Sequence, residues 1–225
     1  MALRVLTWNL FHGRSKPETR RSLMPEFAAT IAGWKWDVAL LQEVLPWWPA
    51  ELARSSGASM RMALTSRNLL PPLQRLIADR RPDLLKSGAG GCNAILVRGQ
   101  AIREHRIRRL RTLPERRVAH GVLLEDGTWV TNLHAQVHRA ADAQADLDLA
   151  ADATTIWAAG APTILGGDLN IPGAPTAFGY EHLGGHWVDH VLGRGLRVVE
   201  RGRTLPHGTL SDHAPLTLVV APVHE

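Results

Sequence analysis

Four strand-like segments follow one another between residues 92 and 135 with no helical pattern among them. They span residues 92–99, 101–110, 117–126 and 128–135, and Gly127 marks a turn between the last two. Short connections of this kind join antiparallel strands, whereas parallel neighbours need a crossover of a dozen or more residues. The sequence therefore predicts antiparallel pairing in this region, which argues against an all-parallel doubly wound sheet.

Helical patterns precede and follow this run of strands. Residues 17–34 repeat large apolar side chains at helical spacing, with Pro17 and Glu18 in the expected first turn, and residues 139–159 are alanine-rich and amphipathic. Further strands are predicted at residues 3–10, 37–44, 161–165, 186–200 and 211–223, whereas residues 45–91 are predicted to form loops and short helices. Two batches of strands, each mixing hairpins with helical crossovers, predict a four-layered α/β sandwich of two packed mixed β-sheets flanked by helices.

Length and composition limit the class of protein. A chain of 225 residues with 45% hydrophobic residues has material for one sizeable core, so we expect a single domain over residues 1–225. The single cysteine, Cys92, excludes an internal disulfide or a thiolate metal site. No apolar run resembles a secretion signal or approaches the roughly 20 residues that span a bilayer. We therefore expect a cytoplasmic monomer without stable membrane association.

Polar residues stand at or just beyond the ends of several predicted buried strands. They are Asn9, Glu43, His134, Asp168, Asn170, Asp189, Asp212 and His213. Alone, each has an ordinary explanation, such as a turn, a solvated surface or a hydrogen-bonded core histidine. Strand ends of a packed sheet converge on one rim, so residues far apart in the sequence can meet there. Burying so many ionisable groups together costs several kcal/mol unless charge or a metal compensates, which predicts a functional site.

The residue types indicate phosphoester chemistry with a hard divalent cation. Oxygen ligands such as Glu43, Asn9 and Asp212 suit Mg²⁺, with Mn²⁺ as the other candidate, rather than zinc. Beside such an ion, Asp168 can orient or deprotonate an attacking water, and Asn170 can donate a hydrogen bond that fixes the water.

Two histidines complete the predicted chemistry. His213, if paired with Asp189, would be held protonated and would stabilise charge on the phosphate. His134 is then available to contact the phosphate or to protonate the leaving oxygen. Gly166 and Gly167, just before Asp168, are expected to let the backbone and the substrate phosphate approach closely.

The same motifs resemble those of the endonuclease/exonuclease/phosphatase superfamily. They occur in the family's order as "LTWNL", "DVALLQEV", "TNLHA", "GGDLN", "VDH" and "SDHAPL", from the first strand to the last. The resemblance implies the four-layered sandwich and hydrolysis of phosphoesters with a divalent metal. It also implies that Glu43 is a metal ligand near Asn9, that Asp212 is a further carboxylate on the metal side, and that Asn93 in "CNAILVR" approaches the site. The carboxylate that orients His134 in deoxyribonuclease-type members is not identifiable in the sequence.

The substrate is predicted from charge and aromatic residues. The net charge is +5, and residues 101–117 hold seven arginines against two glutamates. Such a stretch is either a solvated strand edge or a surface that follows a phosphate backbone, in which case Arg108 and Arg111 would bind substrate. Trp47 or Trp48 could stack on a base. These features favour nucleic acid.

Two alternatives stay open at this point. One is a phosphomonoesterase or phospholipase-like enzyme acting on a phosphorylated small molecule or a lipid head group. The other is a catalytically silent binding module with the same fold.

Overall fold

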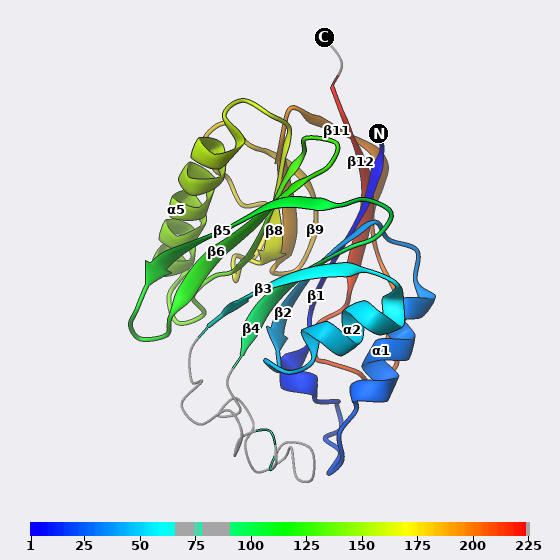
Figure 1. The fold of residues 1–225 in the computed structure, drawn as a ribbon. Helices are drawn as coiled ribbons and strands as arrows, with labels where there is room; N and C mark the ends of the chain where they lie inside the picture. The colour runs from blue at the N-terminus through cyan, green and yellow to red at the C-terminus, as the bar shows by residue number, and fades with distance from the viewer. Residues whose placement is uncertain (66–74, 76, 78–90, 224–225) are drawn as a thin grey trace.

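Two six-stranded sheets pack face to face in the computed structural model, which describes residues 1–65, 75, 77 and 91–223 (Figure 1). The first sheet has the order β11 (Leu196–Thr204), β12 (Leu216–Pro222), β1 (Leu3–Asn9), β2 (Val38–Val44), β4 (Cys92–Val97) and β3 (Ser59–Leu64). The second has the order β5 (Ile102–Arg111), β6 (Arg117–Leu124), β7 (Trp129–His134), β8 (Thr163–Asp168), β10 (Asp189–Arg194) and β9 (Glu181–His186). The strands of residues 92–135 pair antiparallel with one another or with other strands, as predicted, except for the β7–β8 pair.

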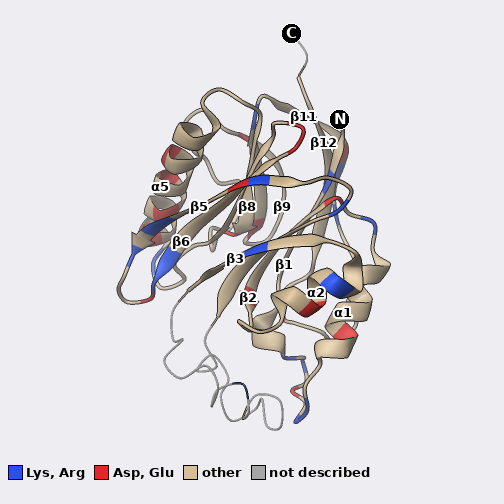
Figure 2. Ribbon diagram, viewed as in Figure 1, with Lys and Arg blue, Asp and Glu red and all other residues tan. Residues whose placement is uncertain are grey.

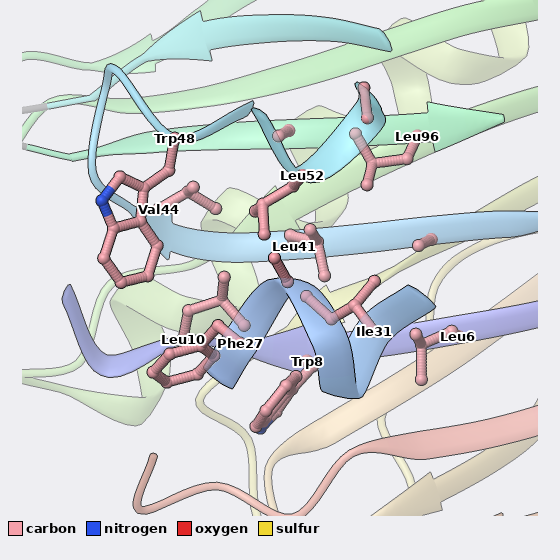
Figure 3. Close-up of a cluster of buried hydrophobic side chains, with 14 of the residues drawn as sticks. Leu6, Trp8, Leu10, Phe27, Ile31, Leu41, Val44, Trp48, Leu52 and Leu96 are labelled. Atoms are coloured by element: carbon pink, nitrogen blue, oxygen red, sulfur yellow. The ribbon is translucent and has the colours of Figure 1, made fainter. Parts of the chain in front are cut away.

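Helices cover the outer face of each sheet. Helices α1 (Met24–Gly33) and α2 (Pro49–Ser56) lie on the first sheet, where Phe27 packs with Trp8 and Trp48 in a buried cluster (Figure 3). Helix α5 (Ala140–Ala158) lies on the second sheet and buries its small and apolar side chains there (Figure 1). A third apolar cluster fills the space between the sheets. The four-layered sandwich is therefore confirmed.

The alternation of side chains explains why both sheets are buried on two faces. In β1, Leu3 and Val5 belong to the cluster between the sheets, whereas Leu6 and Trp8 belong to the cluster under α1 and α2. Successive side chains of a strand point to opposite faces. A strand covered on both faces therefore needs apolar residues at successive positions, which is why β1 reads as a nearly continuous apolar run.

Each sheet is built around one parallel pair of strands. In the first sheet, β1 and β2 are parallel and joined through α1, and in the second, β7 and β8 are parallel and joined through α5. The carboxyl ends of parallel strands lie at the same edge. In Figure 1, β1 and β2 end at the lower end of the sandwich, and η1 (Phe11–Gly13) follows β1 there. Strands β1, β2, β7 and β8 carry most of the residues of the predicted site.

The structure corrects the helix predicted at residues 17–34. The helix begins at Met24 and has Pro25 in its first turn, so Pro17 and Glu18 are not its start. Proline is tolerated in a first helical turn because the amide hydrogen it lacks would have no partner there. The preceding segment is instead tied to the far end of the chain, since the amide of Lys16 donates to the carbonyl of Thr209 at 2.8 Å.

Residues 45–91 contain more regular structure than the predicted loops and short helices. Helix α2 fits that prediction, but β3 is a strand at the sheet edge. Most of residues 66–90, including the prolines at 71 and 72, lie outside the described residues. Strand β9 was also missed, and it too is an edge strand. Among the described residues, no helix has the length and apolar character needed to cross a membrane.

Candidate active site

A cavity of about 260 Å³ opens at the end of the sandwich where β1, β2, β7 and β8 end. Seven of the eight residues predicted from strand ends line it. They are Asn9, Glu43, His134, Asp168, Asn170, Asp212 and His213. The eighth, Asp189, lies directly behind His213, with its Oδ2 atom 2.8 Å from the Nδ1 atom of that histidine. The structure thus brings together groups that are up to about 200 residues apart in the chain.

The sheet register places Asp168 at the centre of this group. Asp168 ends β8 and lies opposite His134 on β7 and opposite Asp189 on β10. Asp189 is the first residue of its strand and not the last, but β10 runs antiparallel to β8 and so begins at the same rim. Facing residues of neighbouring strands are about 5 Å apart, so the pairing alone sets three ionisable side chains side by side.

Asp168 is buried and hydrogen-bonded on both oxygens. The Nδ2 group of Asn9 donates to Oδ2 at 2.9 Å, and the backbone amide of Asn170 donates to Oδ1 at 3.1 Å. Burial and the charge of Asp189 raise the pKa of Asp168 to about 7, against the opposing effect of His213 and of the Asn9 hydrogen bond. A carboxyl group with this pKa can both hold and release a proton near neutral pH.

His213 is held in place by three contacts and carries a positive charge. Its backbone amide donates to Ser211 Oγ at 3.1 Å, and its carbonyl accepts a hydrogen bond from the indole of Trp8 at 2.9 Å. Burial opposes protonation, but the hydrogen bond to Asp189 and the charges of Asp168, Asp189 and Asp212 outweigh it and raise the pKa of His213 to about 9. Its Nε2 atom lies 3.8 Å from Asp168 Oδ2, facing the cavity.

Glu43 reaches the cavity through an irregularity in its strand. The pairing of β2 with β4 shifts register between Leu41 and Val44, and Glu43 has a φ of +49°. Bulges of this kind redirect a side chain near active sites.

His12 also lines the cavity, although the sequence analysis did not identify it. Its Nε2 atom lies 3.2 Å from Glu43 Oε2. Its position three residues after Asn9, in the short helix η1 that follows β1, was the available signal.

His134 lies between the two carboxylates. Its Nε2 atom is 3.6 Å from Asp168 Oδ2 and 4.0 Å from Glu43 Oε1. Burial, followed by the charges of Arg117, His213 and His12, holds the pKa of His134 well below its usual value. This histidine is therefore neutral at pH 7, which suits a hydrogen bond to a phosphate better than delivery of a proton.

The arginines that line the cavity are Arg14 and Arg117, not Arg108 or Arg111. Arg117 is buried, lines the cavity, and donates through Nη2 to Glu115 Oε2 at 2.7 Å. Arg111 instead contacts α5, where its Nε atom lies 2.6 Å from Asp146 Oδ1. Arg108 is exposed on β5, the edge strand that carries basic residues in Figure 2. Neither of the two predicted arginines lines the cavity.

Several smaller predictions need correction. Trp48 is buried against Phe27, and Trp47 packs partly buried on the same cluster, so neither lies open to a base. Asn93 is fully buried in β4 and does not line the cavity. The side-chain Nδ2 of Asn170 donates to the carbonyl of Ala135 at 3.0 Å, which occupies one of the donors predicted to hold water.

The two glycines of "GGDLN" make room for protein backbone. A Cβ atom at Gly167, where φ is +140°, would collide with the carbonyl oxygen of Leu133 on β7. A Cβ at Gly166 would lie 2.9 Å from the carbonyl oxygen of His190 on β10. The expected close approach is therefore real, but these nearest atoms belong to the neighbouring strands and not to a substrate. The glycines let three strands come close enough to set the register around Asp168.

The residues present fit a divalent cation. Asp168, Asp189 and His213 offer ligand atoms that all lie within 4.8 Å of one another. The Oδ1 atom of Asp189 is buried without a hydrogen-bond partner among the described residues. Glu43 and Asp212 add two carboxylates to the same cavity. Carboxylate oxygens are the ligands that hard cations prefer.

Asn9, which the sequence predicts as a metal ligand, uses its side chain for hydrogen bonds within the protein. Its Nδ2 group holds Asp168, and its Oδ1 atom accepts a hydrogen bond from the amide of Phe11 at 2.9 Å. Asn9 therefore orients Asp168. The Oδ2 atom of Asp212, another predicted ligand, lies 3.2 Å from Lys16 Nζ.

Comparison with known families identifies the chain. The model of the endonuclease/exonuclease/phosphatase family matches residues 6–213, so the chain belongs to this family. Members of the family are phosphoester hydrolases and generally depend on divalent metals. A search of curated protein sequences found no match.

Solved structures support the fold. An endonuclease/exonuclease/phosphatase from Bacteroides vulgatus is 14% identical with a TM-score of 0.74, and the alignment covers 99% of this chain and 100% of that one. TDP2 from Caenorhabditis elegans is 15% identical with a TM-score of 0.70, covering 98% and 75%. A mannosyl-6-phosphatase from Bacteroides thetaiotaomicron is 15% identical with a TM-score of 0.70, covering 97% and 99%. At these identities the likeness shows the fold alone.

Proposed function

We propose that this protein is a divalent-metal-dependent phosphodiesterase that cleaves a phosphoester bond with an activated water, and that its substrate is a nucleic acid. One observation carries the proposal. Asp168 is buried and oriented by the amide of Asn9, and it is flanked by the imidazoles of His134 and His213 at a cavity that Glu43 also lines. A base, two groups that can bind phosphate and a carboxylate for a cation thus share one space.

Asp168 is the residue that accepts a proton from the attacking water. Its Oδ2 atom is held by Asn9 and its Oδ1 atom by the backbone of Asn170, so the carboxylate has a fixed orientation toward the cavity. A fixed general base contributes about 10²- to 10⁴-fold to a reaction rate. Asn170 lines the cavity beside it and can help to hold the water.

The two histidines bind the phosphate from different sides of Asp168. His213, kept as an imidazolium by Asp189, directs Nε2 into the cavity and stabilises the negative charge that grows on the phosphate oxygens. His134, neutral and deeper in the site, donates a hydrogen bond to the same group.

Glu43 and Asp212, which both line the cavity, are the groups that would hold the cation. When bound, the ion neutralises phosphate charge and acts as a Lewis acid. We propose Mg²⁺, with Mn²⁺ as the second choice, because the donors are mainly carboxylates.

The charge of the protein outside the cavity supports a nucleic-acid substrate. A net charge of +5 and the basic edge strand β5 favour a polyanionic substrate (Figure 2).

A phosphomonoesterase is the second candidate, because the mannosyl-6-phosphatase shares the fold over almost its full length. A panel assay separates the two. Purified protein is stripped with EDTA, resupplied with Mg²⁺ or Mn²⁺, and offered plasmid DNA, single-stranded DNA, RNA, bis-p-nitrophenyl phosphate, p-nitrophenyl phosphate, mannose 6-phosphate, inositol phosphates and sphingomyelin vesicles.

We expect metal-dependent cleavage of the nucleic acids and of the model diester, lost with EDTA and restored by Mg²⁺. Turnover of the monoesters alone would replace the proposal with the second candidate. Turnover of the vesicle lipid alone would indicate a phospholipase-like enzyme. Failure of every substrate at several metal concentrations would favour a binding module.

A further inference from the structure

An exposed tryptophan stands beside the candidate active site. Trp187 lies in the turn that connects β9 to β10, two residues before Asp189. Its ring centroid is 5.8 Å from that of His213, with an angle of 44° between the ring planes. The side chain is nevertheless 64% exposed. An indole thus lies beside the ring of His213, which lines the cavity, and most of the indole surface is open although Trp187 itself is not a lining residue.

This exposure sets Trp187 apart from the other tryptophans. The chain has eight, all within the described residues, and the other seven are buried or partly buried. Trp187 also has a φ of +55°, a conformation that is unfavourable for a bulky side chain and that turns usually assign to glycine or asparagine. A turn that only had to join two strands would not need an exposed indole in a strained backbone, so this side chain requires another explanation.

Two explanations are compatible with the position. The ring could shield the hydrogen bond between His213 and Asp189 from water, in which case it would matter equally for every substrate. Alternatively, its open surface binds part of the substrate. The high exposure favours the second explanation, because a side chain that serves as a cover is itself packed on most of its surface, as Trp48 is.

We propose that Trp187 is a stacking platform for a planar aromatic group attached next to the scissile phosphate, such as a nucleobase. The inference rests on the proposed function, because it places the phosphate beside His213. An indole presents a flat apolar face on which aromatic rings stack with little regard to their hydrogen-bonding pattern. At 5.8 Å from His213, the platform contacts the group esterified to the phosphate that this histidine binds.

The test compares three diesters that differ in aromatic content. They are the dinucleotide thymidylyl-thymidine, its base-free analogue with a tetrahydrofuran abasic unit in place of each nucleoside, and methyl p-nitrophenyl phosphate. Each is assayed with the parent protein, Trp187→Ala, Trp187→Phe and Phe178→Ala. Phe178 is a fully exposed aromatic residue that precedes β9, at the end of the strand away from Trp187, and does not line the cavity.

We expect Trp187→Ala to lower kcat/KM for the dinucleotide by ten- to a hundredfold and for the base-free dinucleotide by less than threefold. Trp187→Phe should restore most of the loss, and Phe178→Ala should behave like the parent. A matching loss on methyl p-nitrophenyl phosphate would define a platform for any aromatic ring, whereas a loss on the dinucleotide alone would define one for nucleobases.

Equal losses on all three diesters, or no loss on any, would overturn the proposal. If the parent protein cleaved no diester, the proposed function would fail, and binding would still test the platform. Thymidine monophosphate should then quench tryptophan fluorescence in the parent protein and not in Trp187→Phe. Equal quenching in both proteins would remove Trp187 as a binding residue.

Discussion

The two ends of the layer between the sheets are built from the same strands but differ in chemistry. Along β1, the buried residue Val5 gives way to Asn9, and along β8, Ile164 gives way to Asp168. The first member of each pair belongs to the apolar cluster between the sheets, and the second lines the cavity. One end of each strand thus contributes to the stability of the fold, and the other end contributes to the candidate site. Substitutions at the apolar end should therefore affect the free energy of unfolding, and substitutions at the polar end should affect catalysis.

Buried amide side chains separate these two ends. Gln42 on β2 donates to Asn132 on β7 at 2.8 Å, and Asn132 donates in turn to the carbonyls of Leu41 and Ala94 at 2.9 Å. These bonds cross from one sheet to the other. Buried amides with partners contribute to stability, whereas unpaired ones are costly. The three donated hydrogen bonds therefore offset part of the cost of burying these amides, while the Oε1 atom of Gln42 has no partner among the described residues.

The largest expected effect is on catalysis, at the polar end. Asp168→Asn should lower kcat for the diester by at least about a thousandfold, because the amide cannot accept the proton of water. Thermal unfolding should change little, since the amide keeps the shape of the side chain. Asp152→Asn, at an exposed position of α5, is the matched control and should leave kcat unchanged. A kcat for Asp168→Asn within tenfold of the parent value would remove the residue from this role.

A substitution at the apolar end should lower stability and leave kcat nearly unchanged. Ile95→Ala removes a fully buried side chain between the sheets and should lower the free energy of unfolding by about 2–5 kcal/mol. Below the unfolding temperature, kcat should stay within about twofold of the parent. Urea denaturation and initial rates measure the two quantities, and Ile156→Ala on the exposed face of α5 is the control. A large loss of kcat with unchanged stability would contradict the division between the two ends.

The smallest effect is a pH dependence that arises inside the sandwich. Burial, followed by the charge of His105, lowers the pKa of His120 on β6 to about 3, against about 6.5 in an unfolded chain. The unfolded chain therefore binds a proton that the native protein does not, and stability is complete above pH 6.5 and falls as the pH drops below it. The slope from this one residue is about 1.4 kcal/mol per pH unit.

Replacing His120 tests this slope. Urea unfolding of His120→Gln between pH 7.5 and 5 should depend less on pH than that of the parent, by the slope of one histidine. His186→Gln, at an exposed position of β9, should retain the parent slope. Identical slopes for the parent and His120→Gln would show that His120 is not kept neutral by the fold.

Strands and helices with strong apolar periodicity could be predicted from the sequence. The bounds of α5 and of β1 differ from the predicted ones by no more than one residue, because each buries a regular pattern of side chains. Strands β3 and β9 could not be predicted, since an edge strand has few neighbours to pack against and its residues are mostly exposed or partly exposed. A regular apolar pattern arises where side chains are buried, so a strand that is mostly exposed shows no clear pattern in the sequence.

The same limit applies to the candidate site. Residues at the ends of regular strands were predictable, because the register of a sheet carries them to one rim. His12 and Arg117 were missed, although both line the cavity. His12 lies in a short turn with a φ of +53°, and Arg117 is one of many arginines in its stretch of sequence. Nothing in the residue types distinguishes Arg117 from Arg108, and only the packing of β6 against the site does so.

The pairing of β1 with β12 joins the first strand of the described chain to the last, with Thr7 opposite Leu216. The loop that carries His213 is fastened to β1 by the hydroxyl of Ser211, which donates to the carbonyl of Asn9 at 2.6 Å. The candidate site therefore cannot assemble until the chain has been synthesised through residue 213, because Asn9 and His213 both line the cavity. Truncation before residue 211 should abolish the whole site and not only one part of it.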